Sequence, residues 1–376
     1  MKSPPPLLLS VFATFAVGGP QVRFAALANH QGRAWRHAII AMDGRLDCAA
    51  RLSQALDVSF PAVGVRRGAV FSNLPRFRRA LRKLAPDVLL THNWGSIEWA
   101  IANLAPGGVR HIHVEDGFGP EEAREQIRRR VITRRLVLRR STVVLPSVTL
   151  LKVATELWRL PPGSLHYVPN GLDLGRFQPR GAANGDLASD PPPPQVGAVA
   201  ALRPEKNLAR LLRAVRLLRD EGIAFRLAII GDGPERPGLE ALAAKFGMRG
   251  VVTFMGGLDD PAEAYRGLDV FALSSDTEQM PLSVLEAMAT GLPVAATAVG
   301  DVPRMLACEN QPFLCPRNDA ALADALRRLL HDAALRRRVG AANRAKAERD
   351  YDERLMFRRY GQLLAPSPGY GSPPHE

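Results

Sequence analysis

Short apolar segments alternate with amphipathic helical patterns along most of this chain, and this alternation restricts the fold more than any other feature. Strands are expected at Leu7–Ala13, His37–Met42, Asp87–Thr91, Arg110–Val114, Thr142–Leu145, Leu165–Val168, Val196–Leu202, Arg226–Ile230, Val251–Phe254 and 269–273. Helices are expected between them at Leu74–Leu84, Ser96–Leu104, Glu121–Arg140, Val148–Trp158, Leu208–Arg219 and Gly238–Phe246. Because strands that alternate with helices form parallel sheets covered on both faces, the sequence predicts an α/β protein.

A Pro-, Ala- and Gly-rich stretch at 178–194 separates the alternation into two blocks. We therefore expect two doubly wound, Rossmann-like domains that face each other across a cleft. The first is expected at 1–175, a linker at 176–194 and the second at 195–350. A C-terminal helix at 351–364 is expected to cross back to the first domain. The Pro- and Gly-rich residues 365–376 are expected to be a disordered tail.

The composition is that of a globular protein with an unusual charge. The 376 residues carry a formal net charge of +13, which favours an anionic partner such as a phospholipid surface, a phosphorylated glycan or nucleic acid. Nucleic acid is disfavoured because the chain has no zinc-finger spacing or RNP-like motif and only 6% aromatic residues. Three cysteines form no disulfide framework, and no apolar run approaches the roughly 18 residues that span a bilayer. We expect a cytoplasmic protein, held at the inner face of the plasma membrane.

The N-terminal apolar stretch Leu7–Val17 has the length of a signal-peptide core. A single Lys2 and the prolines at 4–6 make a first buried strand the better interpretation. The strand is expected to run into a turn at Gly18 and Gly19, where glycines let a ligand approach the backbone.

Two glutamates stand out in the segment 269–297, which predicts a strand, a loop, a helix and a second strand. Glu278 lies in the loop and Glu286 in the second turn of the helix. The carboxyl ends of parallel strands are where open α/β sheets bind ligands, and a helix N-terminus near Leu282 and Ser283 suits an anion such as a diphosphate. Since carboxylates only accept hydrogen bonds, Glu286 suits the hydroxyls of a ribose and Glu278 those of a hexose.

Further candidates follow other predicted strands. Arg203 and Lys206 lie between the first strand and first helix of the second domain, where cations could neutralise a diphosphate. Gly231 and Gly233 form a turn without the third glycine of a dinucleotide fingerprint.

In the first domain, His113 lies at the end of a predicted strand and could bind a sugar hydroxyl or a developing charge. His111 is expected to face the other side of the sheet. The possible acceptor contacts are Glu115, Asp116 and His92.

The run Arg128–Arg140 contains seven arginines among apolar residues at helical spacing. One face is expected to be buried and the other densely cationic. Two interpretations stay open: a solvated basic face, or attraction to an anionic membrane surface. The only D-x-D sequence, Asp350 to Asp352, lies far from any predicted phosphate-binding turn, so no metal site and no cofactor are expected.

The segment from Glu278 to Val294 resembles the E-x7-E signature of the family 4 retaining glycosyltransferases, and companion motifs extend the resemblance over about residues 7–363. The resemblance implies two Rossmann-like domains in the GT-B arrangement and transfer of a hexosyl-type sugar, with retention and without metal, from a nucleoside-diphosphate sugar to a glycan or lipid-linked acceptor. Cell-surface polysaccharide or lipopolysaccharide assembly is the implied setting. The implied catalytic residues are His113, Arg203, Lys206 and Glu278. The implied donor-binding residues are Gly18, Gly19, Gly231, Gly233, Met280, Pro281, Leu282, Ser283 and Glu286.

Two residues depart from the family pattern, in the loop that would contact the donor hexose. Gln279 stands where a glycine commonly follows the first glutamate, and Pro281 cannot donate an N–H. The identity of the sugar is therefore open. Two other functions also stay open: a nucleotide-sugar epimerase or hydrolase on the same fold, and a basic protein that binds nucleic acid or membrane without catalysis.

Overall fold

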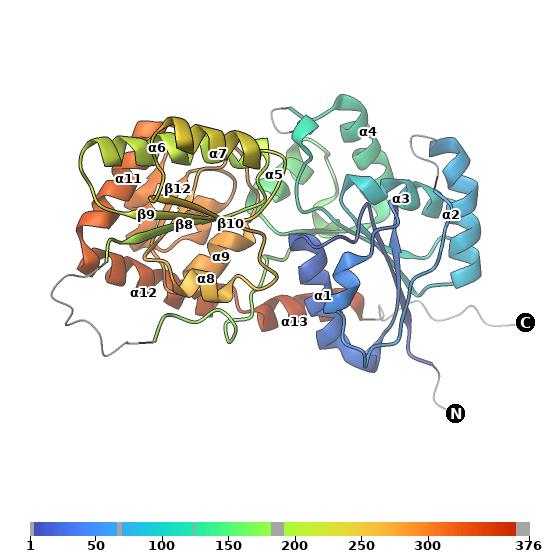
Figure 1. Cartoon of the computed structure of the whole chain (residues 1–376). Helices are drawn as coiled ribbons and strands as arrows, with labels where there is room; N and C mark the ends of the chain where they lie inside the picture. Colours follow the sequence, from blue (N-terminus) through green and yellow to red (C-terminus); the bar gives the residue numbers. More distant parts are fainter. Residues whose placement is uncertain (1–3, 66–69, 123–124, 182–191, 366–376) are drawn as a thin grey trace, which may run out of the picture. The chain divides into compact units, whose positions relative to one another are not determined.

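The computed structural model describes residues 4–65, 70–122, 125–181 and 192–365. The chain divides into two compact units (Figure 1). The first consists of Met1–Pro169 with Arg354–Glu376, and the second is Asn170–Glu353. Among the described residues, no helix has the length and apolarity that crossing a bilayer requires.

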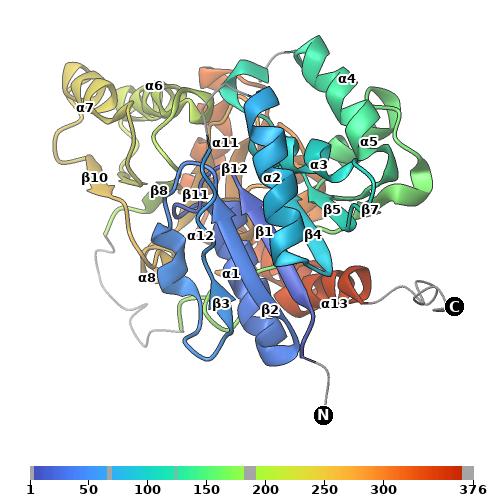
Figure 2. The same ribbon diagram turned by 90° about the vertical axis from the view of Figure 1, so that its right-hand side faces the viewer.

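A parallel sheet of seven strands forms the first unit, in the order β3-β2-β1-β4-β5-β6-β7 (Figure 2). Its strands are β1 (Leu7–Phe12), β2 (Arg36–Ala41), β3 (Val58–Ser59), β4 (Val88–His92), β5 (Arg110–Val114), β6 (Thr142–Leu145) and β7 (Leu165–Tyr167). Its α-helices are α1 (Gly19–Gln31), α2 (Val70–Leu84), α3 (Ile97–Asn103), α4 (Arg128–Val137), α5 (Val148–Glu156) and α13 (Glu353–Leu364). The apolar residues of α1 and α13 pack on one face of the sheet, and those of α2 and α3 pack on the other.

The second unit repeats this plan with six parallel strands in the order β10-β9-β8-β11-β12-β13. They are β8 (Gln195–Val199), β9 (Arg226–Ile230), β10 (Val252–Gly256), β11 (Val270–Leu273), β12 (Val294–Thr297) and β13 (Leu314–Cys315). Its α-helices are α6 (Leu208–Asp220), α7 (Arg236–Lys245), α8 (Ala262–Arg266), α9 (Leu282–Ala289), α10 (Val302–Met305), α11 (Asp319–His331) and α12 (Ala333–Asp350).

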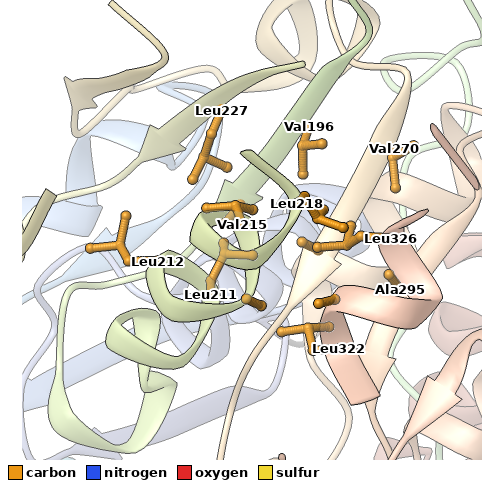
Figure 3. Close-up of a cluster of buried hydrophobic side chains, with 14 of the residues drawn as sticks. Val196, Leu211, Leu212, Val215, Leu218, Leu227, Val270, Ala295, Leu322 and Leu326 are labelled. Carbon is orange, nitrogen blue, oxygen red and sulfur yellow. The ribbon is translucent and has the colours of Figure 1, made fainter. Parts of the chain in front are cut away.

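The core of the second unit lies on both faces of its sheet. Figure 3 shows Leu211 and Val215 of α6 and Leu322 and Leu326 of α11 beside Val196 of β8. Helices α8 and α9 bury their apolar residues in a separate cluster with Phe271 and Val294. The predicted fold class, two doubly wound α/β domains, is confirmed.

Both sheets change direction next to their first strand, β1 or β8, which has its successor on one side and the fourth strand on the other. This order is that of dinucleotide-binding folds, in which ligands bind beyond the carboxyl ends of the strands at such a switch point. The switch points lie between β1 and β4 and between β8 and β11.

The units divide at Pro169, earlier than the predicted boundary at residue 175. Leu172 and Phe177 pack in the core of the second unit, and the Leu172 amide donates to the Tyr351 carbonyl oxygen at 2.8 Å. Most of the predicted linker, 182–191, and the tail from 366 lie outside the described residues.

The expected helix Glu121–Arg140 differs from the structure. A short 3-10 turn occupies Pro120–Glu122, and α4 begins at Arg128. The C-terminal helix has the expected position, and its Met356, Phe357 and Tyr360 join the core of the first unit.

Candidate active site

At the switch point of the second unit, one ion pair joins the loops that follow β8 and β11. Lys206 Nζ lies 2.6 Å from Glu278 Oε1, and the Ser275 hydroxyl donates to the same oxygen at 2.7 Å. The Glu278 side chain is 8% exposed and that of Lys206 24% exposed. The structure thus brings together a cation and a carboxylate that lie 72 positions apart in the sequence.

The two loops are also joined through their backbones. The Asp276 amide donates to the Glu205 carbonyl oxygen at 2.8 Å, and the Ser274 hydroxyl to that of Lys206 at 3.0 Å. These bonds hold the two loops against each other, so the pairing of Lys206 with Glu278 does not depend on their two side chains alone.

Arg210 and Asn207 complete this loop pair and were not among the predicted residues. Arg210 is buried, donates to the Ser274 carbonyl oxygen at 2.7 Å and lies 2.7 Å from an Asp276 carboxylate oxygen. Asn207 caps α6 by accepting from the Arg210 amide and donates to Asp276 at 3.0 Å. Two signals in the sequence could have found them. Asn207 is a favoured N-cap residue at the start of a helical pattern. Arg210 lies within the apolar pattern of that helix, and an arginine is seldom buried without a partner.

Helix α9 begins at Leu282, where the sequence predicted a helix N-terminus, and Pro281 is its N-cap residue. The amides of Leu282 and Ser283 precede the first intrahelical hydrogen bond, which the Val284 amide donates to the Pro281 carbonyl oxygen. Such amides carry the partial positive charge of a helix N-terminus. Met280 is buried beneath this turn, and its carbonyl oxygen accepts from the Asn170 side chain at 2.9 Å.

Glu286 faces the Tyr265 hydroxyl, which donates to its Oε2 at 2.8 Å. Burial raises the pKa of the Glu286 carboxyl, and the hydrogen bond from Tyr265 opposes that rise. Burial also holds the pKa of Tyr265 well above its usual value, so the phenol keeps its proton and remains a donor. The pair holds one carboxylate oxygen in a fixed direction on the second turn of α9.

Close backbone approach explains both glycines of the Gly231-x-Gly233 turn. A Cβ on Gly231, at φ +137°, would lie 1.9 Å from the Ala200 carbonyl oxygen. One on Gly233, at φ +157°, would lie 2.5 Å from that of Leu202. The turn after β9 is therefore pressed against the loop after β8, which carries the exposed Arg203.

Gly300 has the same role on the opposite side and was missed. Its φ is +53°, and a Cβ would lie 2.0 Å from the Glu278 carbonyl oxygen. The loop after β12 is thereby packed against the loop that bears Glu278.

In the first unit, His113 ends a buried polar chain on β4 and β5. The Thr91 hydroxyl lies 2.8 Å from His113 Nδ1 and 2.8 Å from His111 Nε2, and His111 Nδ1 lies 2.7 Å from the Ser141 hydroxyl. The expectation that His111 faces the other side of the sheet is wrong. Residues two apart on a strand share a face, so both rings reach one threonine.

The two acidic candidates that follow β5 are both engaged in ion pairs. Glu115 Oε2 lies 3.1 Å from Arg134 Nε and 3.6 Å from His113 Nε2. Asp116 lies 2.5 Å from an Arg23 guanidinium nitrogen, and both side chains are nearly buried. His92 stacks on Phe12 with ring centroids 3.9 Å apart, and burial holds its pKa well below the usual value.

The arginine-rich helix matches the expectation only in part, since Val137 and Leu138 are buried as an apolar face. Arg134 is fully buried, binds Glu115 and Glu122, and lies 5.0–5.3 Å from the ring centres of Trp94, Phe118 and Trp158. Ile132 and Leu136, expected on the buried face, are 58% and 67% exposed. The carboxylates and aromatic faces bind Arg134 inward and turn the two aliphatic side chains outward.

The Gly18–Gly19 turn lies at the N-terminus of α1, beyond the carboxyl end of β1. It occupies the switch point of the first unit, while the Lys206–Glu278 pair occupies that of the second. Among the described residues, no group of three or more His, Cys, Asp or Glu side chains is arranged to hold a metal ion.

Two family models match this chain, one for each unit. The model of Glycosyltransferase Family 4 matches residues 17–176, and that of Glycosyl transferases group 1 matches residues 182–346. Together they cover most of the chain. The chain belongs to the family 4 glycosyltransferases.

Individual glycosyltransferases share part of its sequence. WcaL of Escherichia coli (strain K12), assigned by name to colanic acid biosynthesis, is 28% identical over 61% of this chain. A D-inositol 3-phosphate glycosyltransferase of Nocardia farcinica is 32% identical over 68%. The matches span 57% and 61% of the length of these two relatives.

Solved glycosyltransferase structures share the fold over nearly the whole chain. The sucrose-phosphate synthase of Thermosynechococcus elongatus superposes with a TM-score of 0.80 at 20% identity, covering 95% of this chain and 98% of that one. Anabaena HepE, solved with UDP-glucose, gives a TM-score of 0.79 at 16% identity, covering 96% and 99%. The chain therefore has the GT-B fold of these enzymes.

Proposed function

We propose that this glycosyltransferase moves a hexosyl-type sugar from a nucleoside-diphosphate sugar to a glycan or lipid-linked acceptor, with retention of configuration and without a metal ion. The observation that carries the proposal is the placement of Lys206, Glu278 and Glu286 around one switch point and one helix N-terminus. This is where the fold binds nucleotides, and each residue type matches one part of such a donor.

Each part of the donor has a chemical counterpart. The exposed Arg203 and the part-exposed Lys206 would neutralise the diphosphate, and the first amides of α9 would add hydrogen bonds. The Glu286 carboxylate, held by Tyr265, would accept from ribose hydroxyls. Glu278 would accept from a hydroxyl of the transferred sugar.

Catalysis would come from charge that develops as the glycosidic bond breaks. The β-phosphate gains negative charge, and fixed cations stabilise that state more than the ground state. Arg203 and Lys206 are the residues proposed for this role. Attack on the same face by the acceptor, assisted by the departing phosphate, would give retention.

Relatives support cell-envelope glycans as the setting. WcaL is named for colanic acid biosynthesis, and WaaG, which superposes with a TM-score of 0.71 at 16% identity, for lipopolysaccharide biosynthesis. A sugar donor is supported by HepE, solved with UDP and with UDP-glucose.

The deciding experiment separates transfer from donor turnover. Nucleotide-sugars are screened by thermal shift, and each one that binds is incubated with and without an extract of glycans and lipid-linked sugars. We expect nucleoside diphosphate release that depends on the extract, and an α-linked product from an α-linked donor by NMR. Equal turnover without acceptor would favour an epimerase or hydrolase, and absence of any nucleotide binding would favour a non-catalytic binding protein.

We also propose that α4 attaches the protein to an anionic membrane surface. Ile132 and Leu136, one helical turn apart, are exposed between two groups of arginines. At 100° per residue, exposed Arg128 and Arg135 flank them on one side of α4 and exposed Arg129 on the other, and exposed Arg139 and Arg140 follow in the 3-10 turn Leu138–Arg140. An apolar stripe bordered by arginines suits the interface of an anionic bilayer better than a solvated helix face.

A further inference from the structure

The buried chain of hydrogen bonds from Ser141 to His113 has a direction, which is set by which group donates in each bond. Each hydroxyl has one hydrogen to donate, and each neutral imidazole has one N–H and one bare nitrogen. The four members are Ser141, His111, Thr91 and His113, and each is at most 9% exposed. Two polarities are therefore conceivable.

In the first polarity every donor within the chain has an acceptor, and only the terminal His113 Nε2–H makes no hydrogen bond among the described residues. The Ser141 hydroxyl donates to His111 Nδ1, His111 Nε2–H to Thr91 Oγ1, and the Thr91 hydroxyl to His113 Nδ1. His113 then carries its proton on Nε2, directed toward Glu115 Oε2 at 3.6 Å. That carboxylate is held by Arg134 and can only accept.

The reverse polarity leaves two groups unsatisfied. His111 would donate to Ser141, whose hydroxyl hydrogen has no second acceptor among the described residues. His113 Nε2 would be a bare acceptor beside the Glu115 carboxylate. The first polarity is favoured because it places an N–H, and not a lone pair, beside the Glu115 carboxylate and leaves no hydroxyl without an acceptor.

Burial keeps the middle of the chain neutral. The pKa of His111 is lowered to about 3 by burial and by the neighbouring His113. A neutral His111 can accept from Ser141 at Nδ1 and donate to Thr91 from Nε2. A protonated His111 could not accept from Ser141, because both of its nitrogens would donate.

We infer that Ser141, His111 and Thr91 are positioning residues that fix His113 as the Nε2–H tautomer, so that His113 acts as a hydrogen-bond donor and not as a base. This inference rests on the proposed function and on the catalytic role that the family resemblance implies for His113. The fitting substrate group is an oxygen that accepts, such as a sugar hydroxyl oxygen or an oxygen that gains charge. Among the described residues, His113 Nε2 is buried and has no hydrogen-bond partner, so its proton is committed to no other group of the protein.

The first test reads the tautomer without any activity. Histidine labelled with ¹⁵N is introduced, and the His113 signals are assigned by their loss in His113→Gln. We expect the native protein to show protonated Nε2 and bare Nδ1. Thr91→Val, which removes only the hydroxyl, should give mixed tautomers, and Thr91→Ser should restore the native spectrum. Protonated Nδ1 in the native protein would overturn the inference, whether or not the protein transfers sugar.

The second test reads turnover with the donor identified by screening. Thr91→Val should lower kcat about tenfold to a hundredfold with little change in KM, because misplacement of a reacting group costs factors of this size. Thr91→Ser should recover most of the rate. Ser10→Ala is the matched control, since Ser10 is a fully buried hydroxyl on the adjacent strand β1 and makes no hydrogen bond among the described residues. A loss in Thr91→Val with an unchanged His113 spectrum, or an equal loss in Ser10→Ala, would contradict the positioning role.

Discussion

Lys206 Nζ and Glu278 Oε1 lie 2.6 Å apart and join the loops after β8 and β11, the two neighbouring strands between which the second sheet reverses its order. The cation proposed to hold a diphosphate is thus already balanced by the carboxylate proposed to hold the sugar. Donor binding must redistribute this pairing. Substitution of Glu278 and substitution of Lys206 should therefore have opposite effects on the affinity for nucleoside diphosphate.

Removing the carboxylate charge should strengthen the binding of nucleoside diphosphate while it weakens catalysis. In Glu278→Gln, Lys206 is released and repulsion between the carboxylate and the phosphates disappears. We expect roughly fivefold tighter UDP or GDP binding, the ~1 kcal/mol that unit charges a few ångströms apart exchange in water. Turnover should fall because the sugar loses an acceptor. Calorimetry and initial rates measure the two effects, and weaker diphosphate binding would contradict this arrangement.

Removing the cationic side chain of Arg203 or Lys206 should lower turnover. Arg203→Ala or Lys206→Ala should lower kcat/KM by about two powers of ten, since each would stabilise charge on the leaving phosphate. Arg249→Ala, an exposed arginine of the same unit, serves as the control. Near-native turnover in the Arg203/Lys206 double variant would place the diphosphate elsewhere.

Glu286 should make nucleotide affinity depend on pH. Its pKa is raised by burial, so acidification protonates it earlier than an exposed glutamate, and affinity should fall as the pH drops through that raised value. Tyr265→Phe removes the hydrogen bond that favours the carboxylate, so the loss should move to higher pH. Titrations of diphosphate from pH 4.5 to 8 test this, with Glu286→Gln as a weak binder that lacks this pH dependence. An unchanged midpoint in Tyr265→Phe would refute the coupling.

His37 should make the first unit less stable in acid. It is 1% exposed, its ring nitrogens have no partner among the described residues, and burial lowers its pKa from 6.5 to about 4. Because the unfolded chain takes up this proton first, stability is complete above pH 6.5 and falls as the pH drops toward 4. The slope is about 1.4 kcal/mol per pH unit. Between pH 7.5 and 5, the free energy of unfolding measured with urea should fall by about 2 kcal/mol less in His37→Leu than in the native chain. Equal losses would show that another group is responsible.

Membrane attachment should require both charge and the aliphatic pair. At low salt the protein should float with vesicles rich in anionic lipid and not with neutral ones, and salt should weaken binding as the screening length shortens from about 10 Å at 0.1 M to about 3 Å at 1 M. Arg128→Gln with Arg135→Gln and Arg139→Gln should abolish flotation. Ile132→Ser with Leu136→Ser should make the remaining binding fully reversible by salt.

The control for flotation is Arg337→Gln with Arg338→Gln, which changes the same residue type at exposed positions of α12. Nucleotide binding should persist in all these variants. Equal flotation with neutral and anionic vesicles, or none with either, would leave α4 as a solvated helix face.

The sequence was sufficient for the fold and for the loops that carry the candidate residues. Strands such as Arg110–Val114 and Thr142–Leu145 and the start of α9 near Leu282 lie where they were expected, because apolar runs and helical periodicity are local signals. Strands β3 and β13 have two residues each, too few to show a period.

Contacts between residues far apart in the sequence could not be predicted from the sequence. Nothing in a run of seven arginines distinguishes Arg134, whose burial depends on Glu115, Glu122 and three aromatic rings from other segments. The pairing of Lys206 with Glu278 likewise depends on strand order, which local periodicity does not contain.

Helix α13 makes the folding of the first unit depend on residues that follow the whole second unit in the sequence. It is the last described helix of the chain, yet its Met356, Phe357 and Tyr360 complete the core built by residues before Pro169. A truncation near residue 353 would therefore damage the first unit and spare the second. A chimaera that exchanges the first unit between two relatives must exchange α13 with it, and a fragment that ends at residue 169 would expose the apolar residues that α13 covers.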